Sequence, residues 1–557
     1  MPKRLLVIGG VAAGPKAAAK ARRCDPDLEI VLYQEEEEIS YAGCGLPYYV
    51  SGVIKERKDL ISRTTDQFAQ EGIQIRKGHR VDFIDPGKRI ISGRDLRSNK
   101  SFADHYDRLV IATGAASIRP KIEGLDLKGV FFLRSIFDAD AILQRIRSAD
   151  VRNVVIAGGG YIGLEMAESL VQLGKKTVIV ELAPQILTLF DEDLAGVLRQ
   201  YLEKKGVQSY TSEGIKAVRG REGKVTHVRT ESRELEADVV LMSLGVRPHV
   251  DLAREAGLRI GETGGVWVDE RMEASADGIY AAGDCAETMH LVSGKRVWVP
   301  LGSTANKQGR VVGINVCGGQ ATFPGVLGTT IFKAFDYKVA KTGLNMREAG
   351  KEGFRPVQAI VRGYDRAHYY PGGKESILKV IADEETGRIL GAQAIGEGPS
   401  DKLIDIVAMA LHGKMTCREL ASVDLAYAPP FSPALSPVIV AANVLMNKLE
   451  GKVAGIQASE VKEKIGSAKG EYQVLDVREE KEVKESRIPG SVWIAYGELE
   501  KRMKELDKKR EIAVHCASGL RSYKACLKLQ QRGFEAVRNI DGGMLCWSYE
   551  VESGEKK

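Results

Sequence analysis

Short apolar runs alternate with helix-like stretches along the chain. Residues 5–8, 29–33, 154–157 and 177–180 are brief, mostly aliphatic runs of the kind that form buried strands. The first and third of these runs lead into glycine-rich turns, and each turn is followed by a stretch rich in helix-forming residues. Strand, glycine turn and helix in this order predict two βαβ units with parallel sheets.

The first turn, residues 9–14, is an imperfect G-x-G-x-x-G sequence in which Val11 takes the place of the middle glycine. A glycine turn at a helix N-terminus can cradle a pyrophosphate, because backbone N–H groups and the helix dipole both favour an anion. The second strand is expected to end on an acid that binds ribose. It ends on Gln34 instead, with Glu35 as the substitute candidate.

The second turn, residues 158–163, matches G-x-G-x-x-G in full. Glu181 follows Gly158 at close to the roughly 20-residue spacing expected of a ribose-binding carboxylate. No arginine follows Glu181 that could hold a 2′-phosphate, and the carboxylate would repel one. The pattern therefore predicts NADH in preference to NADPH, and the two turns together imply two dinucleotides on one chain.

A single cysteine, Cys44, stands between two glycines in the 40–47 segment, shortly after the first βαβ unit. Its nearest neighbours of the same type along the chain are Cys24 and Cys285. A thiol so placed can act as half of a disulfide whose second sulfur arrives on a substrate.

Composition narrows the class of protein. The 557 residues, 44% hydrophobic and 28% charged, indicate a soluble chain of three to five domains. The net charge of +6 comes from interspersed bases and acids, which argues against a nucleic-acid partner. Eight scattered cysteines are expected to be free or catalytic. Without a leader pattern or an apolar run of about 20 residues, we expect a cytoplasmic protein with no membrane partner.

Three basic residues of the first helix, Lys16, Lys20 and Arg23, share one face at helical spacing. They form either a solvated face or a phosphate site beside the Cys44 segment.

Residues 1–447 resemble the FAD-dependent pyridine nucleotide–disulfide oxidoreductases. The resemblance rests on the two turns, the Ala112-Thr113-Gly114 element and Gly283-Asp284, where the family's aspartate meets the ribityl and phosphate region of the flavin. The Cys44 segment resembles the single-cysteine branch, which includes coenzyme A-disulfide reductases and NADH oxidases and peroxidases. Tyr49 stands where the two-cysteine branch has its second cysteine.

The residue at position 12 helps to distinguish which electron acceptor the protein uses. Peroxidases and oxidases of this branch carry a histidine in the first turn, and the matching residue here is Ala12. The resemblance therefore favours a sulfur acceptor over oxygen. It also implies a homodimer in which Tyr369 and Tyr427 reach the active site of the opposite subunit, while His368 is taken as structural and no metal site accompanies it.

The last hundred or so residues resemble a single rhodanese domain. A strand ending in Asp-Val-Arg at 476–478 precedes a second strand, 512–515, and the sequence Cys516-Ala-Ser-Gly-Leu-Arg521. In such a loop at a helix start, backbone N–H groups surround the sulfur. We expect them, with Arg521, to lower the thiol pKa and to stabilise a persulfide anion.

The expected fold is α/β. It has two Rossmann-like dinucleotide-binding domains (FAD and NAD), an α+β dimerisation domain and a C-terminal rhodanese-like α/β domain. The expected limits are 1–118 with 248–322 for FAD, 119–247 for NAD(H), 323–447 for dimerisation, 448–458 for a linker and 459–557 for rhodanese.

The expected site residues fall into four groups. Cys44, Cys516, Tyr369, Tyr427 and Arg521 are catalytic. The residues expected at FAD are Gly9, Gly10, Ala12, Ala13, Gly14, Gln34, Glu35, Val81, Thr113, Gly114, Gly283 and Asp284. Those expected at NAD are Gly158, Gly160, Tyr161, Ile162, Gly163, Glu181 and Gly245. Those expected at coenzyme A are Lys16, Lys20, Arg23, Ser40, Gly43, Arg63 and Asn306.

The function these observations favour is reduction of persulfides, polysulfides or coenzyme A disulfide by NADH. Cys44 would form a mixed disulfide with coenzyme A, and Cys516 would supply sulfane sulfur. Two alternatives stay open: an NADH oxidase or peroxidase that uses a Cys44 sulfenic acid, and a sulfur carrier or redox sensor.

Overall fold

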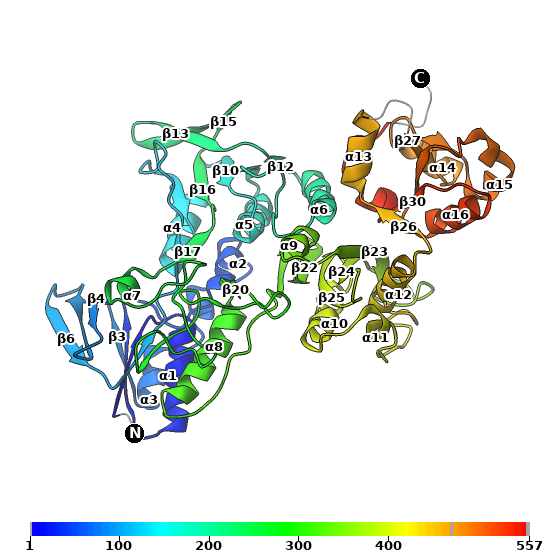
Figure 1. The fold of residues 1–557 in the computed structure, drawn as a ribbon. Coiled ribbons are helices and arrows are strands. Elements are labelled where there is room, and N and C mark those ends of the chain that lie inside the picture. Colours follow the sequence, from blue (N-terminus) through cyan, green and yellow to red (C-terminus); the bar gives the residue numbers. More distant parts are fainter. Residues whose placement is uncertain (1–2, 468–471, 553–557) are drawn as a thin grey trace. The chain divides into compact units, whose positions relative to one another are not determined.

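The computed structural model describes residues 3–467 and 472–552, so the expected domain ends at 1 and 557 lie outside the described residues. The chain divides into two compact units. One contains the residues up to 184 together with 210–326, and the other contains 185–209 together with everything from 327 onward. Figure 1 traces the chain from blue to red.

The first sheet is parallel, with strand order β18-β7-β1-β2-β3. Leu5, Leu6 and Val7 of its central strand are completely buried, as the apolar run predicts. An antiparallel sheet, β4-β5-β6, is formed by the chain between β3 and β7. The strands are β1 (Arg4–Ile8), β2 (Glu29–Gln34), β3 (Ile73–Lys77), β4 (His79–Asp85), β5 (Ile90–Asp95), β6 (Ser101–His105), β7 (Arg108–Ile111) and β18 (Ile279–Ala281).

Two helices, α1 (Ala13–Cys24) and α8 (Gly302–Asn315), lie side by side against this sheet (Figure 1). The close approach depends on glycine. A Cβ at Gly309 or Gly313 would come within 2.5 or 2.6 Å of a backbone oxygen of α1. Shorter helices of this region are α2 (Leu46–Val50), α3 (Thr65–Gln70) and α7 (Asp251–Glu255).

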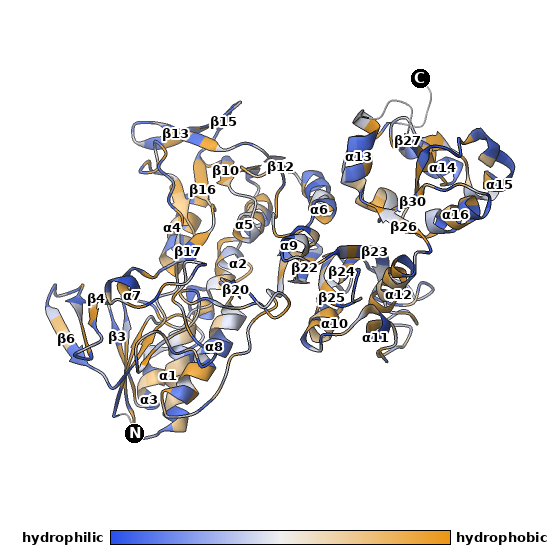
Figure 2. Cartoon of the chain, viewed as in Figure 1, coloured by the Kyte–Doolittle hydropathy of each residue, from blue (hydrophilic) through white to orange (hydrophobic). Residues whose placement is uncertain are grey.

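The second sheet carries the parallel strands β11-β10-β16-β9, of which β10 and β16 show hydrophobic colour in Figure 2. Helix α5 (Tyr161–Gln172) follows β10 directly, as the glycine turn predicts. The other elements are α4 (Ile136–Ile146), β8 (Ala115–Ser117), β9 (Val130–Phe132), β10 (Asn153–Ala157), β11 (Lys176–Val180), β12 (Val207–Tyr210), β13 (Ile215–Arg221), β14 (Lys224–Thr230), β15 (Glu234–Glu236), β16 (Val239–Met242), β17 (Val246–Pro248), β19 (Thr288–Met289) and β20 (Arg296–Val297).

The second unit contains an antiparallel sheet of order β21-β22-β25-β24-β23. Lys379 of β24 is completely buried, and its ammonium group pairs with Asp191 at 2.9 Å and Asp193 at 2.7 Å. The elements are α6 (Glu192–Lys204), β21 (Thr330–Ala334), β22 (Tyr337–Gly343), α9 (Met346–Lys351), β23 (Pro356–Tyr364), β24 (Glu375–Asp383), β25 (Ile389–Gly396), α10 (Ser400–His412), α11 (Cys417–Ala421) and α12 (Pro437–Leu449).

The C-terminal sheet of this unit is parallel, in the order β26-β30-β29-β27-β28. The stretch expected as a linker, 448–458, contains regular secondary structure. It includes the end of α12 and all of β26, which pairs with β30. The elements are β26 (Ala454–Ile456), α13 (Ala458–Ser467), β27 (Tyr472–Asp476), α14 (Glu480–Glu485), β28 (Val492–Trp493), α15 (Leu499–Arg502), β29 (Glu511–His515), α16 (Leu520–Gln531) and β30 (Val537–Ile540).

Among the helices of residues 3–467 and 472–552, none combines the length and the apolar character that crossing a bilayer requires.

Candidate active site

The two glycine turns are built alike. A Cβ at Gly9 would lie 2.0 Å from the Ala112 oxygen, and one at Gly158 would lie 2.2 Å from the Ser243 oxygen. Both glycines have a strongly positive φ, +106° and +103°, which favours glycine. Each turn therefore requires glycine for its own backbone geometry, and each leaves its backbone N–H groups at a helix start.

The side chains expected to meet ribose hold equivalent positions. The Gly10 N–H donates to Gln34 Oε1 at 2.7 Å, and the Gly159 N–H donates to Glu181 Oε2 at 2.7 Å. An amide in the first unit thus does what a carboxylate does in the second. Glu35, the substitute candidate, lies 4.0 Å from the guanidinium of Arg80, at the limit of an ion pair.

Space beside the second turn is open. Among the described residues, no heavy atom would lie within 4 Å of a Cβ built at Gly160. The protein itself therefore does not require glycine at this position, and the room fits a dinucleotide that approaches the backbone.

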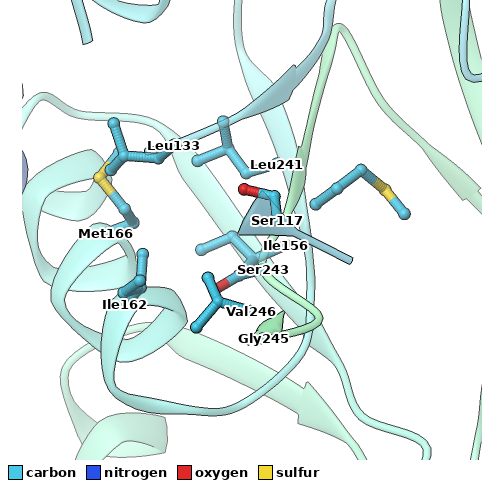
Figure 3. Close-up of a pocket in the computed structure, with 10 residues that line it drawn as sticks. Ser117, Leu133, Ile156, Ile162, Met166, Leu241, Ser243, Gly245 and Val246 are labelled. Atoms are coloured by element: carbon cyan, nitrogen blue, oxygen red, sulfur yellow. The ribbon is translucent and has the colours of Figure 1, made fainter. Parts of the chain in front are cut away.

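A cavity lies at the carboxyl end of the second sheet. Figure 3 shows side chains of α5 and of the β16–β17 connection around it. It is lined by Ser117, Leu133, Ile156, Ile162, Met166, Leu241, Met242, Ser243, Gly245 and Val246. Ile162 and Gly245 are both expected NAD residues, so the structure brings them to one cavity.

Cys44 lies in a single 3-10 turn, Gly43–Gly45, and is exposed. The first residue of α8, Gly302, lies close to the thiol, since a Cβ built on it would be 3.9 Å from Sγ. The pKa of Cys44 is raised. The largest cause is the loss of water around the sulfur, and the negative charges of Glu165 and Asp284 raise it further. Arg134 acts in the opposite direction.

Helix α5 reaches the cysteine segment. Tyr48 donates its hydroxyl hydrogen to Glu165 Oε1 at 3.2 Å, and Ser169 Oγ donates to the Pro47 oxygen at 3.0 Å. Burial raises the pKa of Glu165 to about 7; the nearby Glu168 also raises it, while the Tyr48 hydrogen bond lowers it. Sequence reasoning missed Glu165, although an acid between Leu164 and Met166 in an apolar helical run was a usable signal.

Asp284 is half-buried and pairs with Arg134, whose guanidinium lies 3.1 Å from the carboxylate. Burial raises the pKa of Asp284, while Arg134 lowers it. Nearby, the Gly283 N–H donates to Gln308 Oε1 at 2.8 Å. Arg134 was also missed by the sequence reasoning, because nothing in its local sequence marks it.

The residues expected at coenzyme A lie in several places. Lys16 and Lys20 are half-buried along α8, with their Cβ atoms 3.1 and 2.7 Å from a Cβ built at Gly309 and Gly313 respectively. Arg23 is exposed at the end of α1.

Two further members of that group, Ser40 and Asn306, lie close to the cysteine segment. Asn306 donates to the Gly302 oxygen at 2.9 Å, one turn into α8. The Ser40 N–H donates to the Gly10 oxygen at 2.7 Å, which joins the cysteine segment to the first turn. Arg63, by contrast, pairs with Glu71 and lies over the Phe68 ring.

The remaining expected residues occupy supporting positions. Ala13 and Gly14 are buried at the start of α1, and Val81 packs against the core of the first sheet. The Thr113 hydroxyl donates to the His249 oxygen at 2.6 Å, and Gly114 has φ +73°.

In the second unit, Tyr369 and Tyr427 come together although they lie far apart in the sequence. Both are largely exposed, at 64% and 50%. The interaction of Tyr369 with Tyr427 raises the pKa of Tyr369. Two phenols on one exposed surface are suited to meet a ligand or a second subunit.

Cys516 lies in the loop between β29 and α16 and is 1% exposed. The Gly519 N–H points at its sulfur from 3.1 Å, and Ser522 Oγ lies 3.4 Å from it. Arg521 donates to both carboxylate oxygens of Glu482 at 2.6 Å. The loop therefore has donors aimed at the sulfur, and its arginine is held by a carboxylate.

A buried charge pair lies beneath that loop. Asp476 and Arg478 are almost completely buried and form a two-pronged ion pair. His515, directly before Cys516, has its Nε2 3.6 Å from Asp476. Burial, and to a lesser degree Arg478, lowers the pKa of His515 to about 4, and Asp476 only partly offsets this.

Two turns of the dinucleotide-binding kind, the first joined to a segment with an exposed thiol, define a dinucleotide-dependent thiol oxidoreductase. The family model "Pyridine nucleotide-disulphide oxidoreductase" matches residues 3–309, its dimerisation domain matches 329–438, and "Rhodanese-like domain" matches 457–550. This chain therefore belongs to the pyridine nucleotide-disulphide oxidoreductases, which use FAD and NAD(P)H. The predicted fold class is confirmed.

Known proteins resemble the chain over most of its length. The NAD(P)H sulfur oxidoreductase (CoA-dependent) of Pyrococcus abyssi is 41% identical over 445 residues, which are 80% of this chain and 98% of the relative. The structure of an NAD-dependent persulfide reductase from A. fulgidus is 39% identical, covers 98% of this chain and 100% of its own, and has a TM-score of 0.91. Reduced CoADR-RHD of Bacillus anthracis is 33% identical, with coverages of 98% and 97% and a TM-score of 0.92.

Proposed function

We propose that the chain is an NADH-dependent persulfide and polysulfide reductase that also reduces coenzyme A disulfide, with a fused sulfurtransferase domain. The observation that carries the proposal is the pairing of two thiol loops on one chain, Cys44 in the reductase part and Cys516 in the rhodanese-like part. The relatives named as persulfide and CoA-dependent sulfur reductases support it.

The residues fit the two nucleotides. Gly9, Gly14 and Gln34 would hold FAD, and Gly158, Gly160 and Glu181 would hold NADH, since both turns have the same glycine-dependent backbone and the same strand-end acceptor at a helix start. Bound FAD supplies the two-electron link between the nicotinamide and Cys44. A carboxylate at Glu181 would repel a 2′-phosphate, so NADH is the preferred donor.

In this proposal Cys44 provides one of the two sulfurs of a mixed disulfide. In the resting enzyme its Sγ would be joined to the thiol of coenzyme A, and two-electron reduction would break that bond to give two thiols or thiolates. A thiolate then attacks the outer sulfur of a persulfide or one sulfur of a disulfide, and the better leaving thiolate departs. For a persulfide the sum is RSSH + NADH + H⁺ → RSH + H₂S + NAD⁺.

Cys516 is the proposed sulfur acceptor. Its thiolate takes the sulfane sulfur from a donor and becomes a persulfide, while the donor leaves with the electron pair of the broken bond. The Gly519 N–H and the Ser522 hydroxyl, both aimed at Sγ, support this role because they can donate to the anion.

Several finer assignments belong to the same proposal. The domain limits are 1–118 with 248–322, 119–247, 323–447 and 459–557, and the enzyme is a cytoplasmic homodimer. Lys16, Lys20 and Asn306, which lie along the α1–α8 pair, would bind coenzyme A phosphates. Tyr369 and Tyr427 would donate to a leaving thiolate in the opposite subunit.

The decisive experiment compares acceptors one at a time, with air excluded from every assay except the one that supplies oxygen. NADH oxidation is followed with coenzyme A persulfide, with coenzyme A disulfide and, separately, with oxygen or peroxide as the sole acceptor. The proposal expects fast turnover with the sulfur acceptors and slow turnover with oxygen and peroxide. Faster turnover with oxygen or peroxide than with both sulfur acceptors would replace it with the oxidase or peroxidase alternative.

A further inference from the structure

A buried cluster of charged and amide side chains joins the two sheets of the second unit. The ammonium group of Lys448, at the end of α12, lies 2.5 Å from Asp541 Oδ1, and the two side chains are only 10% and 7% exposed. The same ammonium group donates to the Gln358 backbone oxygen at 2.7 Å. The Gln358 side-chain amide donates to Asp541 Oδ2 at 3.1 Å. Helix α12 and strand β23 thus hold one carboxylate that follows the C-terminal strand β30.

The backbone around this cluster fixes Asp541 as well. A Cβ on Gly455 of β26 would lie 2.4 Å from the Lys448 nitrogen and 2.8 Å from Asp541 Oδ1, so the close approach depends on glycine. The Asp541 N–H donates to the Ile456 oxygen of β26 at 3.0 Å. The position of Asp541 is therefore set both by its side chain and by its main chain.

The residues that follow the cluster hold the Cys516 loop. A Cβ at Gly543 would lie 2.4 Å from the Cys516 oxygen, so the chain passes directly against the loop. The Met544 N–H donates to the Cys516 oxygen at 3.0 Å. The Leu545 N–H donates to the Ala517 oxygen at the same distance. A short stretch of chain thus connects the buried carboxylate to the backbone of the sulfur-holding loop.

We propose that Lys448 and Asp541 are positioning residues for sulfur transfer at Cys516: their buried pair sets the 541–545 segment, and this segment sets the loop. The loop is then held from outside its own sheet, by α12 and β23. The inference rests on the proposed function of Cys516 as the sulfur acceptor. It goes further by giving Lys448, on a helix of the antiparallel sheet, a part in that reaction.

A buried ion pair is suited to this task because it selects one arrangement. Its net contribution to stability is small, since the removal of water from both charges offsets their attraction. Separating the partners while either stays buried leaves a charge without a counterion, which is strongly unfavourable. The Lys448–Asp541 pair therefore penalises every position of the 541–545 segment other than the one that keeps the loop in place.

A second contact of the same part of the chain provides a comparison. Tyr549 donates to Glu192 Oε1 of α6 at 2.6 Å in an exposed position. This hydrogen bond involves no buried charge, and it lies beyond the residues that hold the Cys516 loop. Its loss should therefore leave the loop where it is.

The experiment measures how fast Cys516 is alkylated. The full-length holoenzyme is reduced anaerobically, freed of small thiols and treated with iodoacetamide at one fixed pH, and the modified peptides are quantified by mass spectrometry. A thiol that is 1% exposed reacts when its loop opens. Lys448→Met and Asp541→Asn should each raise the Cys516 rate about fivefold or more. The double variant should rise no further than the single ones, because both changes break one pair.

A thiol in the same core separates positioning of the loop from a general loss of stability. Cys526 of α16 is completely buried and packs in one apolar cluster with Cys516. Its alkylation rate should stay within about 1.5-fold of wild type in all three variants, whereas a destabilised core would expose both thiols.

Two matched controls should leave the Cys516 rate within about 1.5-fold of wild type. Lys464→Met breaks a 2.5 Å ion pair with Glu511 inside the C-terminal part of the chain, and Tyr549→Phe removes the exposed hydrogen bond to α6.

Catalysis supplies an independent measurement. Sulfur transfer from a persulfide to cyanide should fall about threefold or more in kcat in Lys448→Met, with the donor KM changed by less than about twofold. The physical reason is that the loop donors, the Gly519 N–H and the Ser522 hydroxyl, are aimed at the sulfur itself.

Unchanged Cys516 rates in Lys448→Met and Asp541→Asn would overturn the proposal, as would equal rises at Cys516 and Cys526. A rise in the double variant equal to the product of the two single rises would show that the residues do not act as a pair. Retained sulfur transfer in Cys516→Ser would instead remove the proposed role of Cys516. The alkylation pattern needs no sulfur donor and stays readable in that case, so the two failures are distinguishable.

Discussion

Cys44 and Cys516 are both thiols in turns next to a helix, yet their surroundings are opposite. Cys44 is exposed and has acids among its nearest charges. Cys516 is 1% exposed and has a backbone N–H and a hydroxyl aimed at its sulfur. The first site depends on what arrives from outside, namely a second sulfur and electrons. The second is built to hold a sulfur anion with its own donors.

The two sites also differ in how they are held. The Cys516 loop is tied to the segment that follows β30, where the Met544 and Leu545 N–H groups donate to the Cys516 and Ala517 oxygens at 3.0 Å. Just before that segment, Asp541 pairs with Lys448 at the end of α12. The sulfur-holding loop is thus tied by backbone hydrogen bonds to a later segment of its own domain, whereas side-chain hydrogen bonds join the Cys44 segment to α5, from Tyr48 to Glu165 and from Ser169 to the Pro47 oxygen.

The strongest test of this contrast is Cys44→Ser. If Cys44 is the half-disulfide, NADH-driven reduction of persulfide and coenzyme A disulfide should fall by at least about a thousandfold, because serine cannot form the mixed disulfide. Flavin content and sulfur transfer to cyanide should stay unchanged. Steady-state NADH oxidation and a thiocyanate assay measure the two activities. The matched control is Cys24→Ser, another exposed cysteine; retained turnover in Cys44→Ser would remove the single-thiol mechanism.

Cys516→Ser should give the reverse pattern. Sulfur transfer to cyanide should be lost, because serine cannot carry the sulfane sulfur, while reduction of small free persulfides should change by no more than about twofold. Cys526→Ala, further along α16, serves as control and should keep the transfer activity. Equal loss of both activities in Cys516→Ser would mean that the two sites work only as one, and the contrast would fail.

Much of this organisation was predictable from the sequence, because the turns depend on local chemistry. The strand-turn-helix order specified both dinucleotide-type units, and the positions of Gly9 and Gly158 follow from a backbone that admits no Cβ. The equivalence of Gln34 and Glu181 could also be anticipated from their places at strand ends. Local sequence was sufficient wherever a function needs only one segment.

Contacts between distant segments were beyond such reasoning. Glu165 meets Tyr48 across 117 positions, and Arg134 meets Asp284 across 150. Neither pairing leaves a periodic or motif signal. The stretch 448–458 was predicted as a linker for the same reason: Ala454–Ile456 forms a strand only because β30, far along the chain, offers it an edge.

The supply of electrons should affect only one of the two sites. Glu181→Gln makes the second turn resemble the first, with its Gln34, and removes the charge that repels a 2′-phosphate. The preference for NADH over NADPH in kcat/KM should fall about tenfold, with no change in sulfur transfer by Cys516. The reciprocal change Gln34→Glu is the control and should leave nucleotide preference unaltered. An unchanged NADH to NADPH ratio in Glu181→Gln would disprove the assigned role.

The smallest expected effect concerns the response of the Cys516 site to acid. His515 is completely buried with a pKa lowered to about 4, whereas an unfolded histidine titrates near about 6.5. Between those values the unfolded chain binds more protons than the folded one. The stability of the C-terminal domain should therefore be complete above about pH 6.5 and fall, by up to about 3 kcal/mol, as pH drops towards 4. Persulfide reduction at Cys44 should not share this particular loss.

His515→Phe isolates this term. In the described part of the chain neither ring nitrogen of His515 has a hydrogen-bond partner, so a phenyl ring forfeits no hydrogen bond there. The variant should keep sulfur transfer at neutral pH and lose less of it after incubation at about pH 4.5, because no buried base then has to be protonated. Limited proteolysis of the C-terminal domain in the full chain follows the unfolding directly. His412→Phe, at an exposed histidine of α10, should leave the acid loss as in wild type. Equal acid sensitivity in His515→Phe and wild type would show that other groups, and not the buried imidazole, make the sulfur-holding site acid-labile.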